Sequence, residues 1–377
     1  MRKIYLDHAA ATPIDPRVLR LMQPYFSKKY ANPSSGHGMG EEAREAVEQA
    51  RAGVAKMLGA RPEEIIFTSG GTESVNLALK GVAFLKKKGH IITSSVEHAA
   101  VLEPCTYLES MGLSVTYLPV NKYGVVDPQD VAKAIRKDTI LISVMYVNNE
   151  VGAIQPIAEI GNIAHEHNIL FHTDACQAGL LNLDVMALHV DLMTLNGSKV
   201  HGPKGIGILY HRLGVPLVPL QHGGGQESGL RSGTENVPGI IGFAKALELT
   251  QKEKRKESQR LKQVRDYFVQ KVLQQIPQTT VLGPLQLSSP HIVNLAFWDV
   301  EAEVLMRHLS QKRIYVSVGS ACHVQQIRIS HVLQAMGISE KEGLGSIRFS
   351  FGKGTMKQEM DRVIRSLKKI VSALRKV

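Results

Sequence analysis

Two residues in this sequence have side chains and surroundings suited to covalent chemistry. Cys322 lies in "VSVGSACHVQQ" (316–326), among small and polar residues, whereas a structural thiol usually packs among apolar neighbours. An accessible thiolate can attack a bound molecule, so this cysteine is a candidate nucleophile. Lys199 follows the apolar run "DLMTLNGS" and precedes the Gly/Pro loop "GPKG". A lysine at the end of a buried strand suits a Schiff base with a carbonyl cofactor.

Two other motifs suit a phosphorylated, positively charged cofactor. The stretch "SGGTES" (69–74) lies between an expected strand and a helix expected to begin near Glu73. Its glycines, hydroxyls and free N–H groups could cradle a phosphate, although many strand-to-helix turns carry Gly and Thr. Asp174 ends the run "ILFHTD". It either caps a following helix or pairs with a buried cation, such as the protonated pyridine nitrogen of pyridoxal phosphate.

The elements that position these residues follow from hydrophobic periodicity. The segment "GEEAREAVEQARAGVAKMLGA" has an apolar stripe at helical spacing, and a buried strand, "EIIFTSG", follows it. Helical segments such as "AVLEPCTYLESMG" and "DPQDVAKAIRK" separate most of the later strands. These strands are expected in "HIITSS", "LSVTYLPV", "TILISVMYV", "ILFHTDA" and "DLMTLNGS". This alternation predicts an α/β domain with a mainly parallel sheet, covered by helices on both faces.

The pattern changes after Pro238. From Gly239 the chain can continue as one long helix, because no proline interrupts it before Pro277. Beyond it, "HIVNLAF", "IYVSVG" and "SIRFSFG" are expected strands of a smaller α/β domain. We therefore expect a large domain over residues 12–250 and a small one over 251–377 with 1–11. The small domain would carry the cysteine loop, so the site should lie in the cleft between the domains.

Composition limits the possible classes of protein. The 377 residues are 44% hydrophobic, and the longest mainly apolar run, "ILISVMYV", is far shorter than a membrane span. We expect a cytoplasmic protein with no membrane contact. Its three cysteines form neither a disulfide framework nor a zinc motif, and we interpret Cys105 and Cys176 as structural.

The net charge of +11 is attributed to basic residues on the solvated faces of helices. Docking of an acidic protein or a tRNA is the alternative, and we do not expect direct nucleic-acid binding.

Taken in order, these motifs resemble one enzyme family along nearly the whole chain. The chain is similar to the group I cysteine desulfurases of the NifS/IscS type, within the class V aminotransferases and the fold-type I pyridoxal phosphate enzymes. The resemblance implies a large domain with a sheet of the seven-stranded type and a smaller C-terminal α/β domain. The matching stretches are "YLDHAAATP", "NPSSGHGMGEEA", "FTSGGTES", "EHAAVLEP", "YVNNEVGAIQP", "HTDACQA", "GPKGIGILY", "GGGQESGLRSGTEN", "GSAC" and "SIRFSFG".

The resemblance also implies residue roles. The catalytic residues would be Cys322 as nucleophile, Lys199 as the lysine that binds pyridoxal phosphate, and His98 stacked on its ring. The cofactor's ring nitrogen, ring hydroxyl and phosphate would be held by Asp174, Asn149, Gln177, Gly71, Thr72, Asn196 and Ser198. Thr234 would reach the phosphate of the neighbouring subunit, which implies a homodimer. Arg348, with Asn149, would bind the substrate carboxylate.

The implied reaction converts L-cysteine to L-alanine and leaves a persulfide on Cys322. An iron-sulfur scaffold or another acceptor protein would take this sulfur, for iron-sulfur cluster assembly or tRNA thiolation. Gly319, Ser320 and Ala321 suit a mobile tether for a thiol that must act in two places. The alternatives are a selenocysteine lyase, another fold-type I enzyme such as an aminotransferase, or a degenerate paralogue that only binds partners in sulfur transfer.

Three stretches depart from the family pattern. Asn196-Gly197-Ser198 replaces a small pair followed by histidine, although Ser198 can still donate a hydroxyl hydrogen bond. Ser228 stands where arginine is usual, and "CHVQQIRISHVL" replaces small residues and a proline behind the nucleophile. These changes bear on the rate, on cofactor affinity and on the choice of sulfur acceptor.

Overall fold

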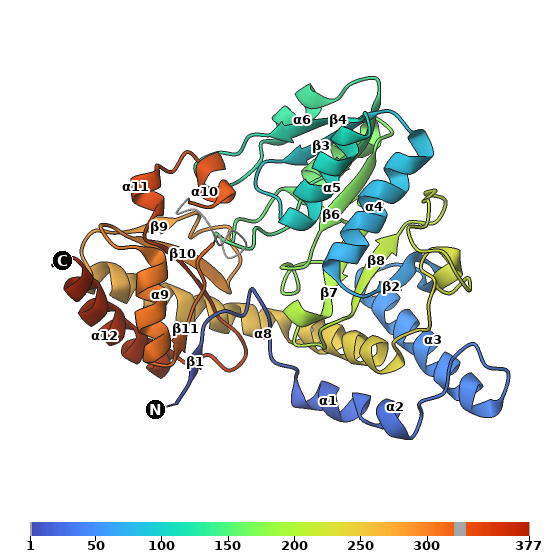
Figure 1. The fold of residues 1–377 in the computed structure, drawn as a ribbon, viewed down its shortest axis with the longest axis horizontal. Helices are drawn as coiled ribbons and strands as arrows, with labels where there is room; N and C mark the ends of the chain where they lie inside the picture. Colours follow the sequence, from blue (N-terminus) through green and yellow to red (C-terminus); the bar gives the residue numbers. More distant parts are fainter. Residues whose placement is uncertain (1, 320–328, 377) are drawn as a thin grey trace.

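The computed structural model describes residues 2–319 and 329–376 (Figure 1). The predicted nucleophile Cys322, with Ser320 and Ala321 of the predicted tether, lies outside the described residues. Within the described part of the chain, no helix combines the length and the apolar character needed to cross a membrane.

A sheet of seven strands forms the centre of the larger half of the molecule, as the alternating pattern predicts. In spatial order its strands are β2 (Ile65–Thr68), β8 (Gly207–His211), β7 (Leu192–Asn196), β6 (Leu170–Asp174), β5 (Thr139–Ser143), β3 (His90–Ser94) and β4 (Ser114–Leu118). The strands from β7 to β4 pair in parallel, whereas β8 is antiparallel to both of its neighbours. The sequence analysis did not predict β8, which follows the Gly/Pro loop after Lys199 rather than a crossover helix.

Helices cover both faces of this sheet. Side chains alternate along each strand, so that Ile65 and Phe67 join one apolar layer while Ile66 joins the other. The first layer is closed by α1 (Pro16–Met22), α3 (Gly38–Leu58), α6 (Pro128–Ala134), α7 (Ile157–Glu166) and the first half of α8 (Val237–Gln275). The second layer is closed by α4 (Gly71–Lys86) and α5 (Ala99–Ser110). The mainly parallel, two-sided α/β fold is confirmed.

Helix α8 is the long helix that the proline-free stretch predicts, and it runs along both halves of the molecule (Figure 1). Its buried residues up to Thr250 lie with the large sheet, and those from Leu261 onward pack in the smaller half. Charged residues separate the two groups, in the stretch "QKEKRKESQR" (251–260). The helix is therefore amphipathic at each end and polar where it crosses between the halves.

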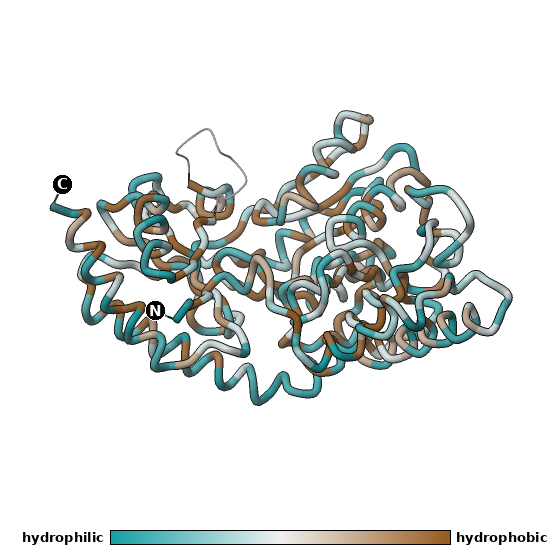
Figure 2. The backbone as a smooth tube through the Cα atoms, turned by 60° about the horizontal axis from the view of Figure 1, so that its bottom comes forward, coloured by the Kyte–Doolittle hydropathy of each residue, from teal (hydrophilic) through white to brown (hydrophobic). Residues whose placement is uncertain are grey.

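The smaller half is built on a second, antiparallel sheet. Strand β10 (Ile292–Phe297) lies between β9 (Thr279–Leu282) and β12 (Ser346–Ser350), while β1 (Ile4–Tyr5) pairs with β11 (Ile314–Tyr315). Helices α9 (Ala302–Gln311) and α12 (Lys357–Leu374) cover it. Apolar and polar residues alternate within each turn of α12 (Figure 2), because one face of the helix packs on the sheet.

The chain start thus belongs structurally to the smaller half, since Ile4 and Leu6 lie in the same apolar cluster as β10 and β12. The other short helices are α2 (Pro24–Ser27), α10 (His331–Ala335) and α11 (Glu340–Gly343). A further apolar cluster joins Val96 and Met145 of the larger half to Val332 and Leu333 of α10. The division at residue 250 remains our prediction.

Candidate active site

Lys199 lies where the sequence places it, directly after β7. It ends a short 3₁₀ turn (Gly197–Lys199), and its Nζ donates to the carbonyls of Ala9 at 2.8 Å and Ala10 at 2.5 Å. Burial lowers the pKa of this amine below its ordinary value, and the nearby charge of Arg348 lowers it further. The amine is therefore more readily available in its neutral, nucleophilic form than the amine of a surface lysine.

Asp174 ends β6, the strand beside β7, so both residues emerge at the same edge of the sheet. Its carboxylate is buried and accepts a hydrogen bond from the N–H of Cys176 at 2.9 Å. This bond stabilises a turn, and no helix follows it directly, so the capping alternative for Asp174 is wrong. A buried carboxylate at this edge is suited to a cationic partner.

His98 follows β3 and caps α5, because its Nδ1 accepts from the N–H of Ala100 at 3.0 Å. Since Nδ1 is the acceptor, the ring proton of the neutral imidazole is on Nε2. Burial lowers the pKa of His98, while the charge of Asp174 opposes this shift and that of Lys199 adds to it. The three side chains therefore surround one site at the carboxyl ends of β3, β6 and β7.

The turn between β2 and α4 closes another side of the site. Gly70 has a φ of 155°, and α4 begins at Gly71, two residues earlier than predicted. A Cβ at Gly71 would lie 2.9 Å from Sγ of Cys176 and 3.6 Å from the amide nitrogen of Asn196. The helix start, Cys176 and Asn196 are thus packed closely together, without room for a side chain at Gly71. The predicted phosphate ligand Thr72 is exposed at the same turn.

Asn196 and Ser198 bond to each other on the adjoining turn. The side-chain oxygen of Asn196 accepts from the N–H of Ser198 at 3.1 Å and from its hydroxyl at 3.2 Å. Asn196 therefore caps the short 3₁₀ turn that carries Lys199. This pair has a clear structural role, and any contact with a phosphate remains a prediction.

Arg348 faces the site from the smaller half. It lies in the centre of β12, and its two Nη atoms donate to the carbonyl of Asn149 and to the carboxylate of Asp7, each at 2.9 Å. Within the described part of the chain, its buried Nε has no hydrogen-bond partner. The guanidinium is thus held in place from two sides, while its Nε–H and the second hydrogen of each Nη remain for other acceptors.

The structure does not bring every predicted residue into this site. Gln177 is near Lys199, since both side chains donate to the carbonyl of Ala9. Thr234 instead lies exposed on the loop that precedes α8. Ser228, on the same loop, has a left-handed φ of 56° and follows Glu227, which is buried against Arg51.

Three acidic residues near the site were not predicted from the sequence. Asp7 is the ion-pair partner of Arg348. Glu97 is fully buried beside His98, and burial raises the pKa of its carboxyl to about 8. Burial also raises the pKa of Glu150, which is buried next to Asn149. The acidic residues that directly follow strand-like runs, in "SSVEHAAV" and "YVNNEVGAI", were a usable signal.

The residues present fit pyridoxal phosphate. The close packing at Gly71 leaves only backbone at the start of the sixteen-residue helix α4, and such a helix start favours a phosphate. Buried Asp174 suits a pyridinium nitrogen, and the partly buried amine of Lys199, with its lowered pKa, suits an aldehyde carbon. Within the described residues no cluster of His, Cys, Asp and Glu could hold a metal ion.

Comparisons with known proteins agree with this arrangement. The profile of the family described as aminotransferase class-V matches residues 4–363. The chain is 49% identical to the cysteine desulfurase IscS of Dictyoglomus turgidum, over 100% of this chain and 96% of that protein. It is 44% identical to the cysteine desulfurase of Rattus norvegicus, over 100% of this chain and 84% of that protein.

Solved structures give the same result. A NifS-like protein, 41% identical, superposes with a TM-score of 0.93, covering 98% of this chain and 100% of that chain. A structure described as SspA in complex with cysteine, 42% identical, superposes with a TM-score of 0.84, covering 93% of this chain and 99% of that chain.

Proposed function

Because this chain belongs to the class-V aminotransferase family, we propose that it is a cysteine desulfurase that converts L-cysteine to L-alanine. The observation that carries this proposal is the convergence of Lys199, Asp174 and His98 at one sheet edge, opposite Arg348. Whole-chain identity of 42% to 49% with cysteine desulfurases supports it.

Pyridoxal phosphate is the proposed cofactor. Lys199 would hold its aldehyde carbon, Asp174 its ring nitrogen, and the helix start at Gly71 and Thr72 its phosphate. His98 would stack on its ring, while Asn149 and Gln177 would lie at the ring hydroxyl. Once bound, the cofactor supplies an electron-withdrawing ring that stabilises negative charge at the substrate α-carbon.

The chain's own residues perform the other steps. The N–H groups of Arg348 bind the substrate carboxylate, and this fixes the α-carbon near the amine of Lys199. The neutral amine of Lys199 takes the α-proton, which its lowered pKa favours. The thiolate of Cys322 attacks the substrate sulfur, so that the Cβ–S bond breaks as a new S–S bond forms. The electron pair of the broken bond stays on the substrate carbon, so that Cβ takes up a proton and Lys199 returns its proton to the α-carbon. Alanine then leaves, and the persulfide remains on Cys322.

The sulfur would then pass to an acceptor protein, either an iron-sulfur scaffold or a tRNA-thiolation protein. We also propose that the enzyme is a homodimer and works in the cytoplasm, where reducing conditions keep free thiols such as the buried Cys105 unpaired. Cys176 is adjacent to Asp174, but burial raises the pKa of its thiol well above the usual range. It is therefore a poor nucleophile compared with an accessible thiol.

The test is peptide mass spectrometry after the purified protein has reacted with L-cysteine. We expect one extra sulfur on the peptide that contains Cys322 and none on those that contain Cys105 or Cys176. Cys322→Ser should retain the yellow colour of the bound cofactor but lose alanine and sulfide production, because a hydroxyl is a poor nucleophile at neutral pH. Lys199→Ala should lose the colour as well.

Two outcomes would contradict the proposal. Wild-type alanine production by Cys322→Ser would favour a selenocysteine lyase or another reaction of the same cofactor. A colourless wild-type protein that takes up no added pyridoxal phosphate would favour a paralogue that only binds partners.

A further inference from the structure

A chain of hydrogen bonds reaches Gln177 from the smaller half of the molecule. Nε2 of His291 lies 3.2 Å from the side-chain oxygen of Gln177, and its Nδ1 lies 2.6 Å from the hydroxyl of Ser289. At its other end, the amide nitrogen of Gln177 donates to the carbonyl of Ala9 at 2.8 Å. The same carbonyl accepts from Lys199, so the chain ends at the proposed cofactor site.

The direction of each hydrogen bond follows from the chemistry of the groups. Burial lowers the pKa of His291 to about 3, so its ring is neutral and carries one N–H. The oxygen of the Gln177 amide can only accept, and therefore Nε2 of His291 is the donor. Nδ1 must then accept the proton of the Ser289 hydroxyl. A flipped amide would place its oxygen against the carbonyl oxygen of Ala9, which is also an acceptor. Both ends of the amide therefore require the same orientation.

Ser289 is itself held in place on two sides. Its N–H donates to the carbonyl of Gly152 at 2.8 Å, and its own carbonyl accepts from Nη1 of Arg265 at 3.0 Å. Ser289 and Arg265 are both 1% exposed. His291 directly precedes β10, the central strand of the smaller sheet. The imidazole therefore has little freedom to turn, and the tautomer that donates to Gln177 is maintained.

We propose that His291 is a positioning residue, which together with Ser289 orients the amide of Gln177 so that its second N–H is presented to the ring hydroxyl oxygen of the cofactor. The inference rests on the proposed function, which assigns Gln177 to that oxygen. An amide in the flipped orientation would present its own oxygen to this electron-rich group. The orienting bond removes that alternative and thereby strengthens cofactor binding.

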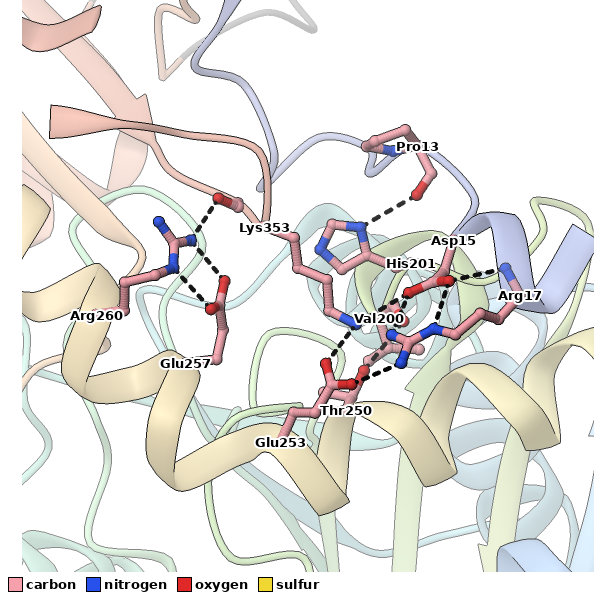
Figure 3. A network of polar contacts seen from close by, with 11 residues as sticks. Pro13, Asp15, Arg17, Val200, His201, Thr250, Glu253, Glu257, Arg260 and Lys353 are labelled. Carbon is pink, nitrogen blue, oxygen red and sulfur yellow. Dashed lines mark hydrogen bonds and ion pairs between the residues drawn. The ribbon is translucent and has the colours of Figure 1, made fainter. Parts of the chain in front are cut away.

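The structure offers a matched control in a second partly buried histidine. His201 and His291 both line a cavity of about 40 Å³ between the two halves of the molecule, together with Gln177 and Lys199. Nδ1 of His201 instead pairs with the carbonyl of Pro13 at 3.1 Å, beside the ion pairs around Lys353 (Figure 3). Replacing His201 thus removes an imidazole of similar burial without removing a hydrogen bond to Gln177.

The experiment measures the dissociation constant of pyridoxal phosphate by titrating cofactor-free protein and following the visible absorption of the bound cofactor. We expect His291→Leu and Ser289→Ala to raise this constant by about 5-fold, within a range of roughly 2- to 13-fold, the usual effect of one neutral hydrogen bond. Both substitutions should also shift the absorption maximum of the bound cofactor. His291→Gln should recover most of the loss, because its amide nitrogen can replace Nε2. His201→Leu should stay within about twofold of wild type.

A double mutant separates positioning from general damage to the fold. In the Gln177→Ala background, His291→Leu should have little further effect, because its partner is already gone. Additive effects, or unchanged binding and absorption in both His291→Leu and Ser289→Ala, would overturn the inference. If wild-type protein itself takes up no pyridoxal phosphate, the proposed function fails instead. Melting temperatures of the cofactor-free variants check that each one is folded.

Discussion

At the scale of single residues, the proposed chemistry depends on the pKa of the Lys199 amine, which its surroundings lower. Burial is the main cause of its lowered pKa, and the neighbouring charges act in opposite directions. Arg348 lowers the pKa further, whereas Asp174 and Asp7 raise it. An amine with a lowered pKa loses its proton at a lower pH, so more of it is nucleophilic near neutrality.

This balance predicts opposite responses to two substitutions. The rate at which an acylating reagent modifies Lys199 in cofactor-free protein should rise with pH, with a midpoint below the ordinary lysine value of about 10.4. Arg348→Ala should move this midpoint upward and Asp174→Asn downward. Peptide mass spectrometry measures the extent of modification at each pH. A shift of both variants in the same direction would show that these charges do not act on the amine.

At the scale of elements, a buried ion pair connects the loop before α8 to the large sheet. Both Nη atoms of Arg51 on α3 bond the carboxylate of Glu227 at 2.8 Å, and the N–H of Phe67 on β2 donates to the same carboxylate at 2.8 Å. The side chain of Glu227 is only 2% exposed. The carboxylate thus joins a helix, a strand and a loop that are far apart in the sequence.

Removing the charge of Glu227 should therefore destabilise the protein strongly. Glu227→Gln removes the buried counter-ion of Arg51 and leaves its largely buried guanidinium with only the half-exposed Glu48, 3.2 Å from Nε, which costs about 3 kcal/mol of unfolding free energy. Urea denaturation measures this change. The control is Glu303→Gln, which breaks the ion pair between Glu303 and Arg307, whose side chains are 67% and 75% exposed. This substitution should change the unfolding free energy by less than about 1 kcal/mol. Equal effects of the two substitutions would contradict the tertiary role of Glu227.

At the scale of the whole molecule, the proposed homodimer gives a function to Thr234. This residue is exposed on the loop that precedes α8. If it completes the phosphate site of the neighbouring subunit, each active site depends on two chains. Light scattering should then give twice the chain mass of 41.4 kDa.

Mixing two inactive or weakened variants tests this dependence. Thr234→Val and Lys199→Ala homodimers should each bind pyridoxal phosphate poorly. A mixed dimer contains one site with an intact Lys199 and an intact Thr234 from the other chain, and this site should recover wild-type affinity. Co-expression with two different tags isolates the mixed dimer. Failure to recover, with the mixed dimer shown by its mass, would mean that Thr234 acts within its own chain.

The elements built from residues close together in the sequence could be predicted, because hydrophobic periodicity and turn residues define them locally. The alternation of strands and helices predicted the two-sided sheet, and the long proline-free stretch predicted α8. Lys199 and Asp174 were recognisable because each ends a buried strand, and carboxyl ends of parallel strands meet at one edge. Gly71 was recognisable as part of a glycine-rich turn before a helix, although the helix begins earlier than predicted.

Other features were decided only by the tertiary structure. The antiparallel strand β8 has no sequence signal for its direction, which depends on the loop that returns it beside β2 and β7. The bond between Arg348 and Asp7 spans 341 positions, and that between His291 and Gln177 spans 114. Local propensity and periodicity carry no information about such pairs. They form only when β1, β10 and β12 assemble into the smaller half and this half packs beside the carboxyl ends of the large sheet.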